Sequence, residues 1–205
     1  MISNIQPIGD IKKAGRKEEK KRSSDPIQAE YDDGIEFLKE NDLTRAAVAF
    51  HNVLRSYEEK KHQDGIANAS NQLGKVYLEK GEFEKAKIHY QRAWDICDRF
   101  GDPMSLLALS MQLVVVNRGL NDNDKALEIC FDMLDVHNRN NNPQGAVATM
   151  ETIADIYLAQ DEKAKAADTY RTIASIHTNF KHKNTAEKFN SRAKELEAEV
   201  EAEAA

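Results

Sequence analysis

The feature that most constrains the fold of this chain is a residue pattern that returns every forty residues. Steps of forty residues from Gly74 reach Gly34, Val114 and Ala154. Twelve residues after these positions stand alanines, at Ala46, Ala86, Ala126 and Ala166. Sixteen residues after them stand Phe50, Tyr90, Cys130 and Tyr170. A pattern kept in phase over four copies predicts a row of similar units, each of which buries a face on its neighbour.

The clearest copy, residues 68–101, shows what each unit is. Small side chains allow two antiparallel helices to approach closely, and they stand at Gly74, Ala86 and Ala93. Large side chains fill the gaps between the helix ridges, at Tyr77, Phe83 and Tyr90. Gly81 permits a tight reversal between the two helices. Each unit is therefore predicted to be a helical hairpin.

On these residues, and on the segment GEFEKAKIHYQRAWDICDRFGD, residues 26–182 resemble the tetratricopeptide repeat (TPR) superfamily. The forty-residue period is similar to the variety seen in kinesin light chains and several bacterial regulators. The resemblance implies an all-α, right-handed superhelical solenoid of four TPR-like hairpins with a C-terminal capping helix. It also implies a non-enzymatic scaffold or adaptor that binds a segment of another protein in a concave groove.

Capping signals divide the chain into segments. The pairs Asp25–Pro26, Asp64–Gly65, Asp102–Pro103 and Asn142–Pro143 are typical helix starts. They predict an N-terminal arm at 1–25, hairpins at about 26–63, 64–101, 102–141 and 142–182, and a capping helix with an acidic tail at 183–205. Asn184 and Glu187 form a capping-box pattern at the start of that last helix. Its apolar stripe is Ala186, Phe189, Ala193, Leu196 and Val200.

The N-terminal arm, residues 1–25, is polar and basic and is expected to be flexible. Isoleucines recur every third residue, at Ile2, Ile5, Ile8 and Ile11, a spacing that suits an extended peptide. Two interpretations stay open: a tail without fixed structure, or a segment that docks on a partner or on this protein's own groove. The following lysines and arginines are either solvated or in contact with phosphate or acidic lipid.

Composition excludes several classes of protein. The net charge of −6 and the pI of about 5.6 argue against a nucleic-acid partner. Cys97 and Cys130 fall within predicted helices, form no disulfide framework and fit a reducing compartment. The chain shows neither a secretory leader nor a stretch apolar enough to span a bilayer. A cytoplasmic protein without a membrane span is expected.

The resemblance places a binding groove on the first helix of each hairpin. Carried onto this chain, the partner-binding positions are Tyr31, Ile35, Asn68, Asn71, Lys75, Met111, Val115, Arg118, Glu151 and Asp155. Their order runs from an aromatic end through amides to an apolar centre and an acidic end, which suits a peptide with a central apolar anchor and a basic residue toward one end. For Met111 and Val115 the alternative is ordinary packing between repeats.

The third hairpin departs most from the pattern, because Asn117 and Cys130 stand where other copies have aromatic residues. Gly119 lies near the end of a predicted helix, where glycine costs about 1 kcal/mol against alanine. Looser local packing is expected there. Two interpretations stay open: a degenerate repeat, or a hinge or polar contact site at Asn117 and Arg118.

No catalytic or metal-binding motif is present in the sequence. It lacks a phosphate-binding glycine loop, His-Glu-x-x-His, Cys-x-x-Cys and Gly-x-Ser-x-Gly. We therefore expect no catalytic residues, no metal and no cofactor. Besides the scaffold, two hypotheses remain: a self-associating structural subunit that uses the N-terminal arm or the C-terminal helix, and an enzyme whose site carries no known motif.

Overall fold

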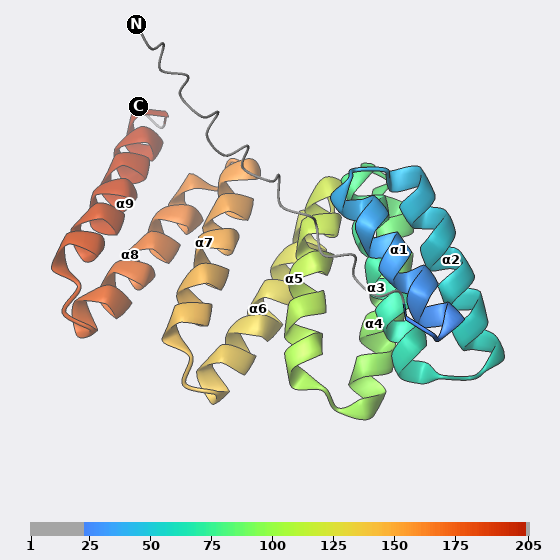
Figure 1. Ribbon diagram of the computed structural model, residues 1–205. Coiled ribbons are helices and arrows are strands. Elements are labelled where there is room, and N and C mark those ends of the chain that lie inside the picture. The colour runs from blue at the N-terminus through green and yellow to red at the C-terminus, as the bar shows by residue number, and fades with distance from the viewer. Residues whose placement is uncertain (1–22, 204–205) are drawn as a thin grey trace, which may run out of the picture.

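The computed structural model describes residues 23–203, and this part of the chain forms nine α-helices and no strand (Figure 1). The predicted arm at 1–25 lies almost wholly outside the described residues. The helices are α1 (Pro26–Lys39), α2 (Leu43–Glu59), α3 (Gln63–Glu79), α4 (Phe83–Phe100), α5 (Pro103–Gly119), α6 (Asn123–Arg139), α7 (Pro143–Ala159), α8 (Lys163–Asn179) and α9 (Lys183–Glu203). They follow one another side by side in chain order, and the predicted all-α solenoid is confirmed.

The corners between helices recur every twenty residues. Each corner has one residue in the left-handed backbone region: Asn41, Lys61, Gly81, Gly101, Asn121, Asn141, Asp161 and Lys181. At the first corner the amide of Asp42 donates to the carbonyl of Phe37, and the equivalent bond closes every later corner. This is the bond that caps a helix end and satisfies its last carbonyls. Turns within and between hairpins therefore have the same construction.

The same register explains where helices begin. The residue after each left-handed position precedes the next helix, and in α2, α5, α6 and α7 its side chain accepts a backbone N–H. In α3 this residue is His62, whose Nδ1 accepts from the amide of Gly65 at 3.0 Å. The prediction that Asp64 caps this helix is therefore wrong. Helix α9 likewise begins at Lys183, so Asn184 lies inside its first turn rather than at its cap.

Small and large residues pair across the first two hairpins as predicted. A Cβ on Gly34 would stand 2.8 Å from the ring of Phe50, and one on Gly74 would stand 2.6 Å from the ring of Tyr90. Both rings are fully buried. In the third hairpin the sizes are exchanged, because Val114 takes the glycine position and Cys130 the ring position. Both are 0% exposed, so the exchange keeps the position filled.

The core is a row of apolar clusters. The first joins α1, α2, α3 and α4, and the second joins α4 to α5 around Tyr90 and Leu113. The third joins α5, α6 and α7 around Cys130 and Ile153. At the end, Ala193 and Leu196 of α9 bury Ala166 and Ala167 of α8. Each hairpin is thus held by its neighbours, and α9 covers the last apolar face.

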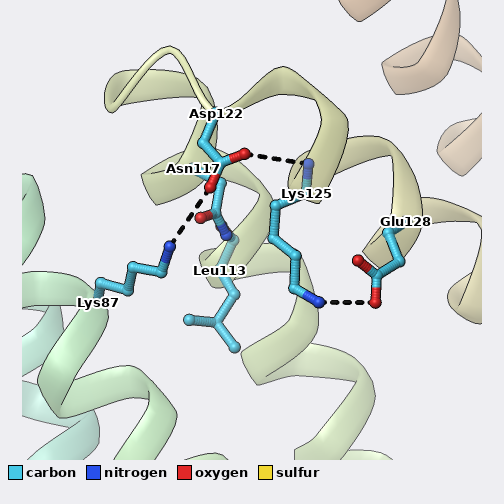
Figure 2. A network of polar contacts seen from close by, with 6 residues as sticks. All are labelled: Lys87, Leu113, Asn117, Asp122, Lys125 and Glu128. Atoms are coloured by element: carbon cyan, nitrogen blue, oxygen red, sulfur yellow. Dashed lines mark hydrogen bonds and ion pairs between the residues drawn. The ribbon is translucent and has the colours of Figure 1, made fainter.

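The third hairpin is not more open than the others. Asn117 is 1% exposed, and its amide nitrogen donates to the carbonyl of Leu113 at 2.7 Å. Figure 2 shows it beneath Asp122, which accepts the backbone amide of Lys125 and pairs with Lys87 of α4 at 3.6 Å. Packing explains the glycine at position 119, because the ring of Phe83 occupies the space that a Cβ there would need. These contacts argue against the expected loose packing.

Candidate functional site

The ten predicted partner-binding residues lie on α1, α3, α5 and α7, the first helices of the four hairpins. We call the side of the molecule that these helices present the odd-helix face. Five of the ten are exposed: Asn68, Lys75, Val115, Glu151 and Asp155. The other five are half-buried: Tyr31, Ile35, Asn71, Met111 and Arg118. The structure brings three of them, Asn68, Asn71 and Lys75, into one hollow.

This hollow, the α3–α5 pocket, has a volume of about 520 Å³. Asn68, Asn71 and Lys75 line it from α3, and Ala108 and Gln112 line it from α5. Helix α4 forms the floor with Tyr90, Ala93 and Cys97. The pocket forms there because Ala93 and Ala108 are small where two neighbouring repeats face each other.

Amide side chains dominate the polar lining of the pocket. Gln72 donates to the Tyr31 hydroxyl at 3.1 Å, and Gln112 accepts a long hydrogen bond of 3.4 Å from the Tyr90 hydroxyl. Among residues 23–203, the side chains of Asn68 and Asn71 have no hydrogen-bond partner. Two amides that face a pocket with both donor and acceptor unused are suited to bind another backbone.

The charged side chains in the pocket offset each other, and its titratable thiol and hydroxyl groups stay neutral. Lys75 lies 4.0 Å from Glu79 on the same helix, so the two charges offset each other. Burial, with a smaller contribution from Asp102, raises the pKa of the Cys97 thiol. Burial also raises the pKa of Tyr90 above its usual value. Cys97 is therefore protonated near neutral pH, which makes it a packing residue rather than a nucleophile.

The other predicted residues lie outside this pocket. Tyr31 and Ile35 pack against the first core cluster, and Met111 packs against the third. Val115 is 42% exposed and so is not ordinary core. Glu151 lines a separate hollow of about 270 Å³ with Phe180 and His182. The acidic end is thus a second location, not a continuation of the α3–α5 pocket.

Sequence reasoning missed several residues of the pocket, among them Gln72, Gln112 and Tyr90. Gln72 and Gln112 stand forty residues apart, each two residues before a register mark, and this signal was available in the sequence. Tyr90 was assigned only to the core, yet its ring is also part of the pocket floor.

The odd-numbered helices of the four hairpins are more acidic than the even-numbered ones. Helices α1, α3, α5 and α7 carry eight acidic and three basic residues, whereas α2, α4, α6 and α8 carry ten acidic and eleven basic. The first set therefore has a net charge of −5 and the second of +1.

A second hollow lies between α4 and α6, with α5 as its floor. This α4–α6 groove has a volume of about 720 Å³. Its apolar walls include Trp94, Leu106, Leu107, Ile129 and Val136. The sequence pattern did not predict this groove, because side chains from three consecutive helices form it.

Two other kinds of site find no support between residues 23 and 203. No three His, Cys, Asp or Glu side chains in that range gather closely enough to hold a metal ion. No helix in that range combines the length and apolarity needed to cross a membrane.

Comparison with known proteins shows similarity in structure only. The sequence matches no protein-family model and no curated protein. In structure, the apo form of RapI superposes with a TM-score of 0.72 at 15% identity, over 86% of this chain and 49% of RapI. The TPR-like repeats of a putative kinesin light chain from Podospora anserina superpose with a TM-score of 0.69 at 12% identity, over 86% of this chain and 88% of that one.

The protein has a TPR-like repeat fold. The predicted resemblance to TPR proteins is confirmed at the level of the fold. A third TPR-like structure is the Rap conjugation gene regulator of plasmid pLS20 in complex with the Phr* peptide, with a TM-score of 0.58 at 10% identity. The superposition covers 85% of this chain and 54% of that regulator, so this TPR-like chain spans about half the length of both Rap proteins.

Proposed function

We propose that this protein is a non-enzymatic scaffold that binds a peptide segment of another protein on its odd-helix face, with the α3–α5 pocket as the centre of the site. The observation that carries the proposal is the pair of unpartnered amides, Asn68 and Asn71, in a pocket with an apolar floor. An asparagine amide both donates and accepts, so it can bond a peptide N–H and C=O at once.

The flanking predicted residues extend the site along the odd-helix face. Val115 offers an exposed apolar contact on α5, beside Met111 and Arg118. Tyr31 and Ile35 mark the α1 limit of the face, and Glu151 and Asp155 mark its α7 limit, outside the α3–α5 pocket. Since the odd-numbered helices of the four hairpins have a net charge of −5, the favoured partner is a peptide with an apolar anchor and a net positive charge.

The comparisons support this proposal by analogy of fold. The pLS20 conjugation regulator, which shares the TPR-like fold, is in complex with a peptide. That complex supports the idea that such a solenoid presents a surface on which a peptide lies.

A selection of random displayed peptides on the full chain tests the proposal, followed by calorimetry with the selected sequences. Asn71→Ala is expected to weaken binding about 2- to 10-fold, the effect of losing one or two hydrogen bonds. Asn138→Ala is the matched control, because Asn138 is an exposed asparagine on α6. Selected peptides should be enriched in lysine, arginine and apolar residues.

Two results would contradict the proposal. One is a selection that yields no peptide with saturable binding. The other is a selected peptide whose affinity falls with Asn138→Ala and is unchanged with Asn71→Ala, since the bound surface would then be the even-numbered helices.

A further inference from the structure

The α4–α6 groove is an apolar surface that the proposed peptide site does not use. Trp94 lines it from α4, Leu107 from α5, and Ile129 and Val136 from α6. All four side chains are half-buried, so each still offers apolar surface to a ligand. Trp94 is the single tryptophan of the chain, and its ring nitrogen donates to Ser110 Oγ at 3.2 Å.

The rim of the groove carries carboxylates that lack partners. Asp98 of α4 and Asp132 of α6 both line it and are both exposed. Within the described range 23–203, neither side chain has an ion pair or a hydrogen bond. The Glu128 carboxylate, in contrast, is bound by Lys125 at 2.6 Å. Arg139 also lines the groove and has no ion pair within the described range. The groove therefore combines apolar walls with three carboxylates (Asp98, Glu128, Asp132) and two cations (Lys125, Arg139), a net charge of −1.

One segment of the chain has the matching chemistry. Residues 1–22 contain isoleucine at every third position from Ile2 to Ile11, followed by lysines and arginines. Seven basic and three acidic residues give this segment a net charge of +4. Since the whole chain has a net charge of −6, the remaining residues carry −10. Lys12 and Lys13 directly follow Ile11.

The connecting chain is long enough. Thirteen residues lie between Ile11 and Asp25, the cap of α1, so fourteen steps join the two Cα atoms. Fully extended, these steps span about 46–50 Å. A path across four neighbouring helix axes covers about 40 Å at roughly 10 Å each. On this estimate the segment can reach the groove of its own copy, and equally that of a second copy.

We propose that the isoleucine segment, residues 2–11, binds in the α4–α6 groove, with the isoleucines against Trp94 and its apolar neighbours and the following lysines beside Asp98 and Asp132. The apolar walls favour this groove over the α3–α5 pocket, whose polar lining is mainly amides. Burial of isoleucine side chains supplies the affinity, and the opposite charges orient the segment.

Trp94 fluorescence tests this directly. The full chain is compared with a chain that lacks residues 1–22, and a synthetic peptide of residues 1–22 is then added to the shortened chain. We expect the deletion to shift Trp94 emission to longer wavelength and to increase its quenching by acrylamide, and the peptide to reverse both changes in a saturable manner. A peptide with all four isoleucines replaced by serine is expected to have no effect.

Surface variants keep the test independent of folding. The double variant Asp98→Lys, Asp132→Lys is expected to raise the peptide Kd about threefold or more, and the control Asp155→Lys on the odd-helix face to change it less than about twofold. A signal independent of protein concentration assigns the segment to its own copy, and a doubled mass by light scattering assigns it to a second copy. Identical Trp94 emission in both chains, with no response to the peptide, would overturn the proposal.

Discussion

The imidazole of His89 lies flat against the ring of Tyr77, with ring centroids 5.4 Å apart and an angle of 7° between the planes. His51 completes a three-ring cluster, since its Nε2 lies 2.9 Å from the Tyr77 hydroxyl. The cluster ties together α2, α3 and α4. His89 Nδ1 is buried without a hydrogen-bond partner, and burial, assisted by His51 and Arg92, lowers the pKa of His89 to about 4.

This cluster predicts acid sensitivity. At pH 7.5 His89 is neutral in both the folded and unfolded chain. As the pH falls from about 6.5 toward 4, the unfolded chain takes up a proton that the folded chain does not, so stability is lost. After a discount for partial exposure, the loss is about 1–2 kcal/mol. Urea unfolding at pH 7.5 and pH 4.5 should show a smaller acid loss for His89→Gln than for the wild type. Equal losses would mean that His89 is not the sensitive group.

The pairing of Gly74 with Tyr90 predicts a size-exchange experiment. Gly74→Val alone should lower the free energy of unfolding by about 1–3 kcal/mol, because the ring of Tyr90 occupies the space for a Cβ. The double variant Gly74→Val, Tyr90→Cys copies the natural pair Val114 and Cys130. It should recover at least about 1 kcal/mol relative to the sum of the two single variants. Strict additivity in denaturant unfolding would refute the pairing.

Position 117 and position 77 occupy the same place in neighbouring repeats and should respond differently. Asn117 Oδ1 is buried without a partner, so Asn117→Ala removes an unsatisfied acceptor along with one hydrogen bond. Its expected cost is below about 1 kcal/mol. Tyr77→Ala removes a packed and hydrogen-bonded ring, at an expected cost of about 3 kcal/mol or more. Comparable losses in thermal unfolding would contradict this account of the third repeat.

The C-terminal helix α9 is expected to stabilise the fold through the apolar side chains that it buries against α8. Leu196 is 1% exposed against α8, and Leu196→Ala is expected to cost about 2–4 kcal/mol. Val200→Ala, one turn later and only half-buried, serves as the control and should cost less than half as much. Circular dichroism in urea measures both. If the two variants unfold alike, α9 is not a structural cap.

The fold was predictable because its determinants are local and periodic. The register of Gly74 and Tyr90 identified the hairpin, and the capping residues Asp25, Asp102 and Asn142 identified three of the four hairpin starts. The start of α3 was missed because histidine is an unusual capping residue, although His62 occupies the same corner position as Asp102 and Asn142. The expectation of loose packing in the third repeat failed because Val114 and Cys130 change size together.

The candidate site was only partly predictable. The resemblance to TPR proteins implied Asn68, Asn71 and Lys75, but the pocket also depends on Gln72 and Gln112, which line it together only when neighbouring repeats stack. The α4–α6 groove depends on the relative placement of three helices. That placement arises from the twist between hairpins, which no residue pattern in a single repeat encodes.

The corners that recur every twenty residues also set rules for how such a chain can change in length. An insertion of forty residues at a corner adds one hairpin and keeps every later helix in phase. Loss of one residue within a helix instead turns all following side chains by about 100° around that helix axis. The fold is therefore expected to tolerate insertions and deletions only when they add or remove whole hairpins.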